Sequence, residues 1–332
     1  MGVSAALLPS HETVRGLRVV RIGLLGAGTV GQAVARAAAA AAPRLRARGV
    51  ALSIECTLVR DVAKPRQAPR FTRLTTNPEA FLRGRYDVVI DALPGREPAA
   101  TIVGRLLGKG TPVVSANKAM VAAEGRRLRR IAARGGTTLR IEATALAGVP
   151  FIGAFERRPL AADAERFTAI VNGTSNFILT RIADGLTFDA ALAEAQTFGY
   201  AEPDPSDDIS GQDSLRKLII LGDLLLGVEI RPERVTVEGI EALTPAALVD
   251  ARARDEVIKP IVFAERQGAH VTAHVAPRVL PASHPLAGVT GRNNGILIES
   301  RNSGPLLFTG AGAGPDVTAA TLLDDAIEVV HG

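Results

Sequence analysis

Residues Arg18 to Gly31 read RVVRIGLLGAGTVG, and this stretch decides the fold of the first half of the chain. It begins as an apolar strand, and Gly26, Gly28 and Gly31 follow at the opening of an alanine-rich helical stretch. A strand, a glycine turn and a helix in this order are typical of dinucleotide binding. The glycines permit the tight turn and let backbone N–H groups approach a pyrophosphate at the positive helix end. The alternative is a βα turn that is merely close-packed.

The rest of the first half alternates strands with helices, as a doubly wound parallel sheet does. The expected strands are Val50 to Val59, Tyr86 to Leu93, Thr111 to Ser115 and Thr138 to Ala143, and the expected helices are Ala99 to Leu107 and Val121 to Arg134. Ligands of such a sheet bind at the carboxyl ends of its strands. We therefore expect Lys118, which closely follows a strand, to point into the cofactor cleft.

The end of the second expected strand bears on the choice between two nicotinamide cofactors. An acidic residue there would hold the adenosine ribose of NAD, whereas a cation suits the 2′-phosphate of NADP. The sequence has Arg60 followed by Asp61, with Lys64 and Arg66 close behind. These cations favour NADP, while Asp61 leaves NAD open, and a solvated basic loop is the alternative without function.

Beyond the first half the regular alternation is lost, so we place a domain boundary near Ala147. Residues 18–147 are expected to form the NAD(P)-binding domain, after a disordered lead over residues 1–17. Residues 148–309 are expected to form an α+β catalytic and dimerisation domain with a mixed sheet. Its expected strands are Phe167 to Val171, Val235 to Ile240, Ile261 to Glu265, His270 to Val279 and Gly295 to Glu299. Residues 310–332, a glycine-rich loop and a helix, are expected to complete the nucleotide domain.

The stretch from Gly199 to Leu225 carries the strongest candidate chemistry of the second domain. An acidic loop comes first, and its prolines should hold the carboxylates on a stiff, extended segment that disfavours helix. These acidic residues are Glu202, Asp204, Asp207 and Asp208. From about Asp213 the apolar spacing turns helical, which places Asp213 and Lys217 four residues apart at the margin of the buried face. Such a pair could face a pocket.

An aspartate and a lysine at this spacing are more often a solvated pair on a helix surface. Lysine usage favours the other interpretation, because the chain has only five lysines against thirty-four arginines. A lysine kept against this bias can do what arginine cannot, since a partly buried ammonium can exchange its proton. Lys217 and Lys118 are the two lysines that this argument selects.

Composition excludes several other classes of protein. No apolar run approaches the eighteen residues that a membrane span needs, and the N-terminal segment lacks the cationic start of a secretory signal, so we expect a cytoplasmic protein without membrane contact. The single cysteine, Cys56, excludes an internal disulfide. The five histidines show no metal-ligand spacing. The net charge of +5 comes from dispersed arginines with few aromatic residues, so no nucleic-acid partner is expected.

Eight motifs in order give the chain a resemblance to homoserine dehydrogenases from Val19 onward. They are GLLGAGTVG (23–31), VRDVAKPR (59–66), VVSANKAM (113–120), IEATALAGVP (141–150), NGTSNFIL (172–179), GYAEPDPSDDISGQDSLRKL (199–218), HPLAGVTGRNNGILIES (284–300) and GAGAGPDVTAATLL (310–323). The resemblance implies a Rossmann-type nucleotide domain, and a reaction that interconverts L-aspartate 4-semialdehyde and L-homoserine with NAD(P). That reaction belongs to the biosynthesis of threonine, methionine and isoleucine.

The resemblance also implies roles for particular residues. Asp213 and Lys217 would act at the oxygen of the substrate, and Lys118 would lie between nicotinamide and substrate. Glu202 and Asp208 would bind the substrate ammonium, together with Thr174 in the substrate site. Our hypothesis is that Lys217 donates a proton to the developing alkoxide while hydride reaches the aldehyde carbon. Implied cofactor contacts are Gly26, Gly28, Thr29, Val30, Gly31, Arg60, Lys118 and Gly312.

Two further features follow from the resemblance alone. One is a monovalent cation, Na⁺ or K⁺, held largely by main-chain carbonyls at Glu142, Ala145, Ala147 and Val149. The other is a homodimer formed through the mixed sheet. The sequence DALPGREP (91–98) departs from the more apolar family pattern near the nicotinamide. No regulatory ACT domain or fused aspartate kinase is expected.

Two alternatives stay open from the sequence. Another NAD(P)-linked semialdehyde or imine reductase could share the nucleotide half, although it would not be expected to carry the acidic residues and lysine of the 199–225 stretch. A catalytically silent nucleotide-binding or partner-binding protein is the second alternative. The presence of both lysines and all four carboxylates, at Glu202, Asp208 and Asp213 among others, argues against it.

Overall fold

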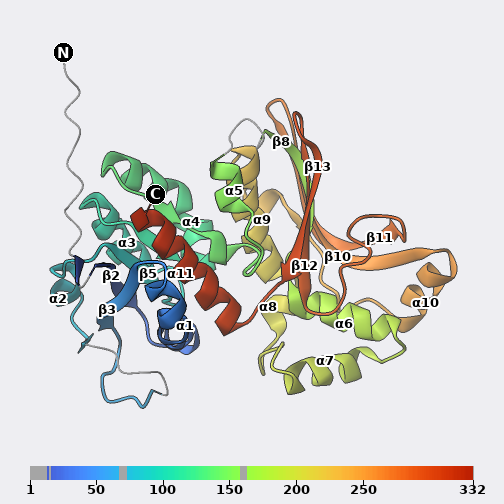
Figure 1. The fold of residues 1–332 in the computed structure, drawn as a ribbon. Helices are drawn as coiled ribbons and strands as arrows, with labels where there is room; N and C mark the ends of the chain where they lie inside the picture. The colour runs from blue at the N-terminus through green and yellow to red at the C-terminus, as the bar shows by residue number, and fades with distance from the viewer. Residues whose placement is uncertain (1–12, 15, 67–72, 158–162, 332) are drawn as a thin grey trace.

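A computed structural model describes residues 13–14, 16–66, 73–157 and 163–331 of the chain. Two sheets form two domains that lie beside each other (Figure 1). The strands are β1 Thr13–Val14, β2 Leu17–Leu25, β3 Val50–Leu58, β4 Leu74–Thr75, β5 Val88–Asp91, β6 Val113–Ser115, β7 Leu139–Arg140, β8 Ala164–Ile170, β9 Thr236–Val237, β10 Glu256–Gln267, β11 His270–Pro281, β12 Asn293–Ser300 and β13 Gly304–Ala311. The helices are α1 Thr29–Arg46, α2 Pro78–Leu82, α3 Ala99–Gly108, α4 Lys118–Arg134, α5 Ile152–Glu156, α6 Gly173–Ala183, α7 Phe188–Thr197, α8 Ser206–Ile209, α9 Gln212–Leu226, α10 Pro245–Ala253 and α11 Pro315–His331, with 3₁₀ turns η1 at Glu142–Thr144 and η2 at Pro232–Arg234.

The first sheet has the doubly wound strand order that the sequence predicts. Its order is β4-β3-β2-β5-β6-β7, all parallel, and β1 is added antiparallel to β2. The order reverses direction between β2 and β5, and a ligand of such a sheet binds outside the carboxyl ends at this switch point. The fold class, an α/β nucleotide domain plus a domain with a mixed sheet, is confirmed.

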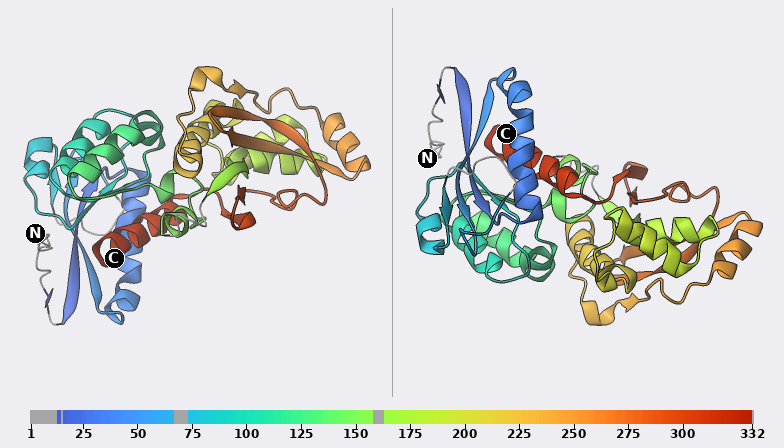
Figure 2. Two further views of the ribbon diagram at one scale, coloured as in Figure 1. Left: turned by 90° about the horizontal axis from the view of Figure 1, so that it is seen from above. Right: turned by 90° about the horizontal axis from the view of Figure 1, so that it is seen from below.

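Helices cover both faces of this sheet. On one face α1 packs beside α11 (Figure 2). Their apolar side chains form one core with those of β2, β5 and β6. On the other face α2, α3 and α4 bury a second core that includes Phe81 and Leu128. One face of the first sheet is therefore covered in part by α11, which lies far from the other helices of this domain in the sequence.

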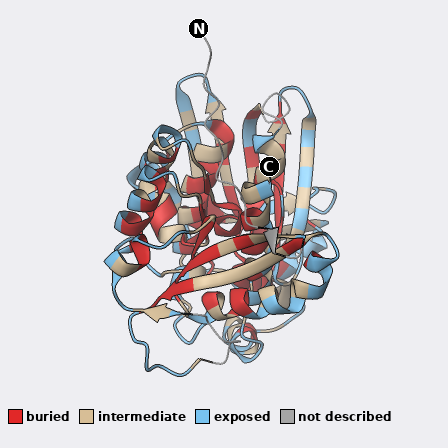
Figure 3. Cartoon of the chain, turned by 60° about the vertical axis from the view of Figure 1, so that its left-hand side comes forward, coloured by how far each residue is buried: buried red, intermediate tan, exposed pale blue. Residues whose placement is uncertain are grey.

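The second domain is built on a six-stranded sheet of order β13-β12-β8-β10-β11-β9. All its pairs are antiparallel except β9 with β11, so the sheet is mixed. Helices α5 and α9 cover one side, where Phe167, Ile296 and Leu221 are fully buried. The buried residues of both domains concentrate on the strands and the inward helix faces (Figure 3).

Helix α9 joins the two domains. Leu218 and Leu221 pack into the core of the mixed sheet, whereas Ile220 packs into the core of the nucleotide domain. On the α4 side, Asp223 forms ion pairs with Arg126 and Arg129. The first turns of α9 therefore lie at the seam between the domains.

Several sequence expectations need correction. The strand expected at Thr138 to Ala143 is only β7, because the chain turns into η1 at Glu142. The acidic loop is not extended throughout, since Ser206–Ile209 forms helix α8. Strand β13 was not expected at all.

The expected disordered lead lies mostly outside the described residues. Its described part includes Thr13–Val14, which pairs with the start of β2. In the described parts of the chain, no helix is both long and apolar enough to cross a membrane.

Candidate active site

A single carboxylate, that of Asp213, binds two lysine ammonium groups at the seam between the domains. Its Oδ1 lies 2.8 Å from Nζ of Lys118, and its Oδ2 lies 2.9 Å from Nζ of Lys217. Lys118 is the first residue of α4, whereas Asp213 and Lys217 lie in the first turns of α9. The packing of α4 against α9 thus brings together groups that lie far apart in the sequence.

The two ammonium groups have different surroundings. The side chain of Lys217 is 8% exposed and that of Lys118 is 40% exposed. Burial lowers the pKa of Lys217, and the charge of Lys118 adds to this effect, although Asp213 opposes it. Burial acts on Lys118 in the same direction, but Asp213 outweighs it, so the pKa of Lys118 is raised. Burial alone would raise the pKa of Asp213, yet the two lysines hold it below its ordinary value.

The carboxylate cluster is extended by Asn172, which caps helix α6. Its Oδ1 accepts a hydrogen bond from the backbone N–H of Ser175 at 2.8 Å. Its Nδ2 donates to Asp208 Oδ1 at 2.7 Å and to Asp213 Oδ2 at 3.0 Å. Burial raises the pKa of Asp208, and the neighbouring Asp213 carboxylate adds to the shift, while the amide of Asn172 opposes it.

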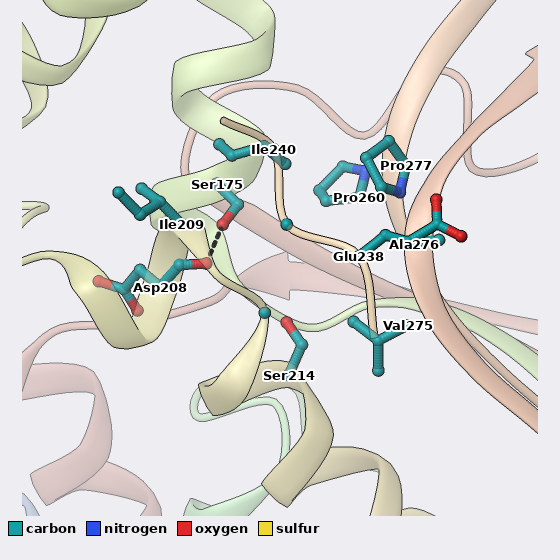
Figure 4. A pocket seen from close by; sticks show the side chains of 12 residues that line it. Ser175, Asp208, Ile209, Ser214, Glu238, Ile240, Pro260, Val275, Ala276 and Pro277 are labelled. Atoms are coloured by element: carbon teal, nitrogen blue, oxygen red, sulfur yellow. Dashed lines mark hydrogen bonds between the residues drawn. The ribbon is translucent and has the colours of Figure 1, made fainter. Parts of the chain in front are cut away.

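The main chain of Asp208 is anchored separately from its carboxylate. Ser175 Oγ donates to the carbonyl of Asp208 at 2.8 Å, and both residues line a small cavity beside Ser214 and Val275 (Figure 4). The Asp208 carboxylate points away from this cavity (Figure 4). The cavity therefore does not enclose the Asp208 carboxylate.

The carbonyl of Val171, next to Asn172, links the lysine to the C-terminal loop. Lys217 Nζ donates to this carbonyl, and Asn294 Nδ2 donates to it at 3.1 Å. Asn294 Nδ2 also donates to the carbonyl of Gly312 at 3.2 Å. A Cβ atom on Gly312 would lie 2.3 Å from Asn294 Oδ1, so only glycine fits at this close approach.

The fingerprint glycines form a cradle at the switch point. Gly26 has φ +93°, and a Cβ there would lie 2.8 Å from the carbonyl of Ala92. A Cβ on Gly31 would lie 2.1 Å from the carbonyl of Gly26. Gly28 is the N-cap of α1, and apart from its own chain neighbours no atom of the described residues lies within 4 Å of its Cβ position. The N-terminus of α1 thus offers free N–H groups and an open approach at Gly28, as a bound pyrophosphate requires.

A groove continues from this cradle along α1. It is lined by Thr29, Gln32, Arg36 and Pro65. Arg60 is exposed and is not among these lining residues. Arg66 donates hydrogen bonds to the carbonyls of Asp61 and Lys64, at 2.6 and 2.7 Å, and so closes the basic loop on itself.

The comparisons with known proteins agree over both domains. Residues 26–142 match the family described as homoserine dehydrogenase, NAD binding domain, and residues 150–327 match the family described as homoserine dehydrogenase. The chain belongs to the homoserine dehydrogenase family. It is thus an NAD(P)-dependent oxidoreductase with homoserine dehydrogenase activity.

Curated homoserine dehydrogenases from two organisms illustrate this likeness. The protein of Corynebacterium glutamicum is 35% identical over 99% of this chain and 77% of its own length. That of Mycobacterium leprae is 36% identical over 93% of this chain and 72% of its own length. The chain therefore spans about three quarters of these relatives.

Solved homoserine dehydrogenase structures share the fold. The enzyme of Thiobacillus denitrificans has a TM-score of 0.87 at 34% identity, covering 96% of this chain and 74% of that chain. A putative homoserine dehydrogenase of Archaeoglobus fulgidus has a TM-score of 0.81 at 30% identity, covering 94% and 100%. A hyperthermophilic archaeal homoserine dehydrogenase in complex with NADPH has a TM-score of 0.75 at 26% identity, covering 94% and 97%.

The structure brings most of the expected site residues of this homoserine dehydrogenase together, but not all. Lys118, Asp213, Lys217 and Asp208 share one hydrogen-bonded cluster through Asn172. Thr174 lies in the first turn of α6 and donates from Oγ1 to the carbonyl of Tyr200 at 2.7 Å. Glu202 is exposed, and among the interactions of the described residues none involves its carboxylate. Its expected contact with the substrate ammonium stays a prediction.

The segment expected to hold a cation is occupied by protein hydrogen bonds. The Glu142 carboxylate accepts the backbone N–H groups of Phe151, Ile152 and Gly153 at 2.7 to 2.9 Å and so caps the start of α5. The carbonyl of Ala147, a residue with φ 50°, accepts from Thr321 Oγ1 at 2.9 Å. The carbonyl of Glu142 accepts the N–H of Ala145.

Sequence reasoning missed three residues that the structure places in or beside the site. Asn172 and Asn294 are buried: Asn172 donates to the Asp208 and Asp213 carboxylates, and Asn294 donates to the carbonyl of Val171, which also accepts from Lys217. The signal for Asn172 was its position before a helix, where an N-cap is expected, but an Asn-Gly pair also indicates a plain turn. Arg36 follows Thr29 and Gln32 on one helix face, so helical spacing from the fingerprint could have found it.

Proposed function

We propose that Lys217 exchanges the proton with the oxygen of the substrate, and that Lys118 supplies a lasting positive charge beside it. The observation that carries this assignment is the pair of unequal ammonium groups on one buried carboxylate. The buried Lys217 has a lowered pKa, so it gives up its proton more readily than an exposed lysine does. The pKa of Lys118 is raised, so it stays charged.

The bound nicotinamide cofactor would supply or accept the hydride at the substrate carbon. In aldehyde reduction, Lys217 donates a proton to the developing alkoxide and Asp213 holds its ammonium in place. In homoserine oxidation, the neutral amine of Lys217 takes the hydroxyl proton. Lys118 stabilises the alkoxide in both directions, because its charge is fixed before the reaction begins.

The substrate ammonium is assigned to the acidic side of the cluster. Asp208 Oδ1 accepts from Asn172, and within the described part of the chain no protein group donates to Asp208 Oδ2. A carboxylate whose pKa is raised by burial gains most from an incoming cation. Glu202, on the exposed loop before α8, would close over the substrate from the solvent side.

NADP is the cofactor that we propose for this chain. The glycine cradle and the open Gly28 fit a dinucleotide pyrophosphate, and a related archaeal homoserine dehydrogenase was solved in complex with NADPH. Arg60 stands at the end of β3, where the 2′-phosphate of the adenosine ribose would lie. Arg36, which lines the groove and lies 3.6 Å from Asp316, is a second cation within the same region.

Initial rates of L-homoserine oxidation with NADP⁺ and NAD⁺ in parallel test the cofactor assignment. We expect Arg60→Gln to raise KM for NADP⁺ by about 10- to 100-fold, the effect of losing a charge-assisted hydrogen bond, and to leave KM for NAD⁺ nearly unchanged. Arg36→Gln is the matched comparison. If only Arg36→Gln loses the preference for NADP⁺, the phosphate contact belongs to α1. Equal rates with both cofactors in the wild type would contradict NADP preference altogether.

A monovalent cation at residues 142–149 stays a proposal from family resemblance. A carbonyl oxygen has two lone pairs, so the carbonyls of Glu142 and Ala147 can accept a cation in addition to their present donors. The cation would then fix the turn before α5. No catalytic step is assigned to it.

We also propose that the chain forms a homodimer through the mixed sheet. The strand β13 leaves Leu307 46% exposed, opposite the apolar Leu297 of β12 on the same face. An exposed apolar outer strand is a liability that a partner copy would cover. Light scattering during size-exclusion chromatography should give twice the chain mass of 34.6 kDa. Leu307→Arg should shift the protein to the single mass, and a wild type of single mass at micromolar concentration would contradict the dimer.

A further inference from the structure

The fully buried carboxylate of Asp91 is the feature of the nucleotide domain that the reaction above leaves unused. Asp91 ends strand β5 and is 0% exposed. Its Oδ1 accepts from the N–H of Leu93 at 3.1 Å, and its Oδ2 accepts from Ser115 Oγ at 2.8 Å. Burial raises its pKa to about 6, against the effect of these two hydrogen bonds, and no charged side chain contributes.

Ser115 connects Asp91 by hydrogen bonds to the turn that precedes Lys118. It ends strand β6 beside Asp91 in the parallel register, and its Oγ accepts from the N–H of Asn117 at 3.0 Å. The Ser115 hydroxyl donates its proton to Asp91, so its Oγ can only accept, through a lone pair, from the N–H of Asn117. Asn117 Oδ1 then caps α4 by accepting from the N–H of Met120 at 3.0 Å. Lys118 is the next residue after this cap.

The same network also fixes the loop after β5. Asn117 Nδ2 donates to the carbonyl of Gly95 at 2.7 Å, and Leu93 donates to Asp91. Both sides of the cofactor cleft at the ends of β5 and β6 are therefore tied to one carboxylate. An ionised carboxylate can only accept hydrogen bonds, so it forces both donors to point toward it. A neutral group could donate as well and would allow other arrangements of the serine hydroxyl.

We propose that Asp91 is a positioning residue, which acts through Ser115 and Asn117 to hold Lys118 against Asp213 at the reacting oxygen. This inference rests on the proposed role of Lys118. A buried ionisable group without a cationic partner is costly to keep, because charged groups lose their hydration on burial. In this proposal the Asp91 carboxylate is kept because it orients two loops at the site, through the N–H of Leu93 and the hydroxyl of Ser115.

The substitutions Asp91→Asn and Ser115→Ala test the proposal, with Ser115→Thr as the conservative comparison. We expect kcat for homoserine oxidation to fall by about 10- to 100-fold in the first two variants. This is the loss expected when a catalytic group is displaced by up to about 1 Å. KM for L-homoserine should change much less. Ser115→Thr keeps the hydroxyl and should retain most of the wild-type kcat. If Asp91 had only a structural role, the substitutions would lower the thermal midpoint of unfolding without lowering kcat selectively over KM.

The pH dependence of kcat is a second test of the proposal. The wild type needs ionised Asp91, so its kcat should fall as pH is lowered through about 6, and this fall should be absent from Asp91→Asn. Should Asp91→Asn fail to fold, the comparison of Ser115→Ala with Ser115→Thr decides the question. Wild-type kcat in Ser115→Ala would overturn the proposal.

Double substitution separates this inference from the role of Lys118. If Asp91 acts through Lys118, then Asp91→Asn should lower kcat little further in a Lys118→Ala background. An equal additional loss there would overturn the proposal. A Lys118→Ala enzyme with wild-type kcat would instead remove the proposed role of Lys118 itself. Normal kcat in Asp91→Asn beside an impaired Lys118→Ala would overturn the positioning role alone.

Discussion

Replacing Lys217 by arginine is expected to lower kcat for homoserine oxidation by about a hundredfold to ten-thousandfold, while the enzyme still binds both substrates. This is the range that a positioned proton-transfer group contributes. The guanidinium of arginine keeps a positive charge near Asp213 but does not give up its proton, so it cannot take the hydroxyl proton. Steady-state kcat and KM, measured on folded protein, check this expectation.

Two further measurements sharpen the Lys217 prediction. Because burial lowers its pKa, homoserine oxidation in the wild type should rise with pH through a value below 10.5, and aldehyde reduction should fall over the same range. Lys217→Arg should lack both changes. Lys259→Arg is the control, since Lys259 is also buried but, among the described residues, donates to the carbonyl of Val289 and to no carboxylate. Near-normal turnover in Lys217→Arg would rule out the proton-transfer role.

Two alanine substitutions in the fingerprint should fail in different ways. A Cβ on Gly31 would meet the Gly26 carbonyl at 2.1 Å, and Gly26 itself is held against the carbonyl of Ala92. The backbone must shift, so Gly31→Ala should lower the free energy of unfolding by about 1–3 kcal/mol or more. At Gly28 the Cβ position has no atom of the described residues within 4 Å besides those of its chain neighbours, and φ is −76°, so we expect the fold to tolerate alanine there.

Gly28→Ala should nevertheless weaken cofactor binding, because its methyl group would occupy the approach of the pyrophosphate. Thermal unfolding without cofactor should then change only in Gly31→Ala, whereas fluorescence titration with NADPH should show weaker binding in both variants. Tight binding of NADPH by Gly28→Ala would mean that the pyrophosphate does not pass over this glycine. Wild-type stability of Gly31→Ala would mean that the turn can relax at no cost.

The nucleotide half was predictable because its signals are local. The spacing of Gly26, Gly28 and Gly31 after an apolar strand defines a turn whose conformation few sequences can adopt. The strands of a parallel sheet are buried on both faces, so they stand out as apolar runs. The prediction of a strand over residues 138–143 was wrong at its end, because the Glu142 carboxylate caps α5. That contact is made with residues farther along the chain.

The mixed sheet was harder, because edge strands follow different rules. Strand β13 contains Gly304 and Pro305, which argue against a strand in the interior of a sheet. Proline is tolerated on an outer strand, where no neighbour needs its missing N–H, and β13 is outermost. Only the position of the strand in the sheet resolves this, and sequence alone does not give that position.

In the candidate site, too, local features were predictable from the sequence and tertiary contacts were not. Asp213 and Lys217 could be paired from their spacing on one helix, and Lys118 was placed in the cleft by the rule for parallel sheets. That Lys118 reaches the opposite oxygen of Asp213 depends on how α4 packs on α9. The part of Asn172 in binding two carboxylates depends likewise on tertiary contacts, because its local pattern indicates only a turn or a cap.

The last helix gives the chain an unusual order of assembly during synthesis. The nucleotide domain is translated first, but the part of one sheet face that α11 covers beside α1 stays uncovered until α11 arrives, after the second domain has been synthesised. At about 5–20 residues per second, this interval lasts on the order of ten seconds or more. During that time the apolar side chains of β2 and β5 that α11 will cover are accessible to chaperones. The core that α11 shares with α1, β2 and β5 is therefore completed only after the second domain has been synthesised.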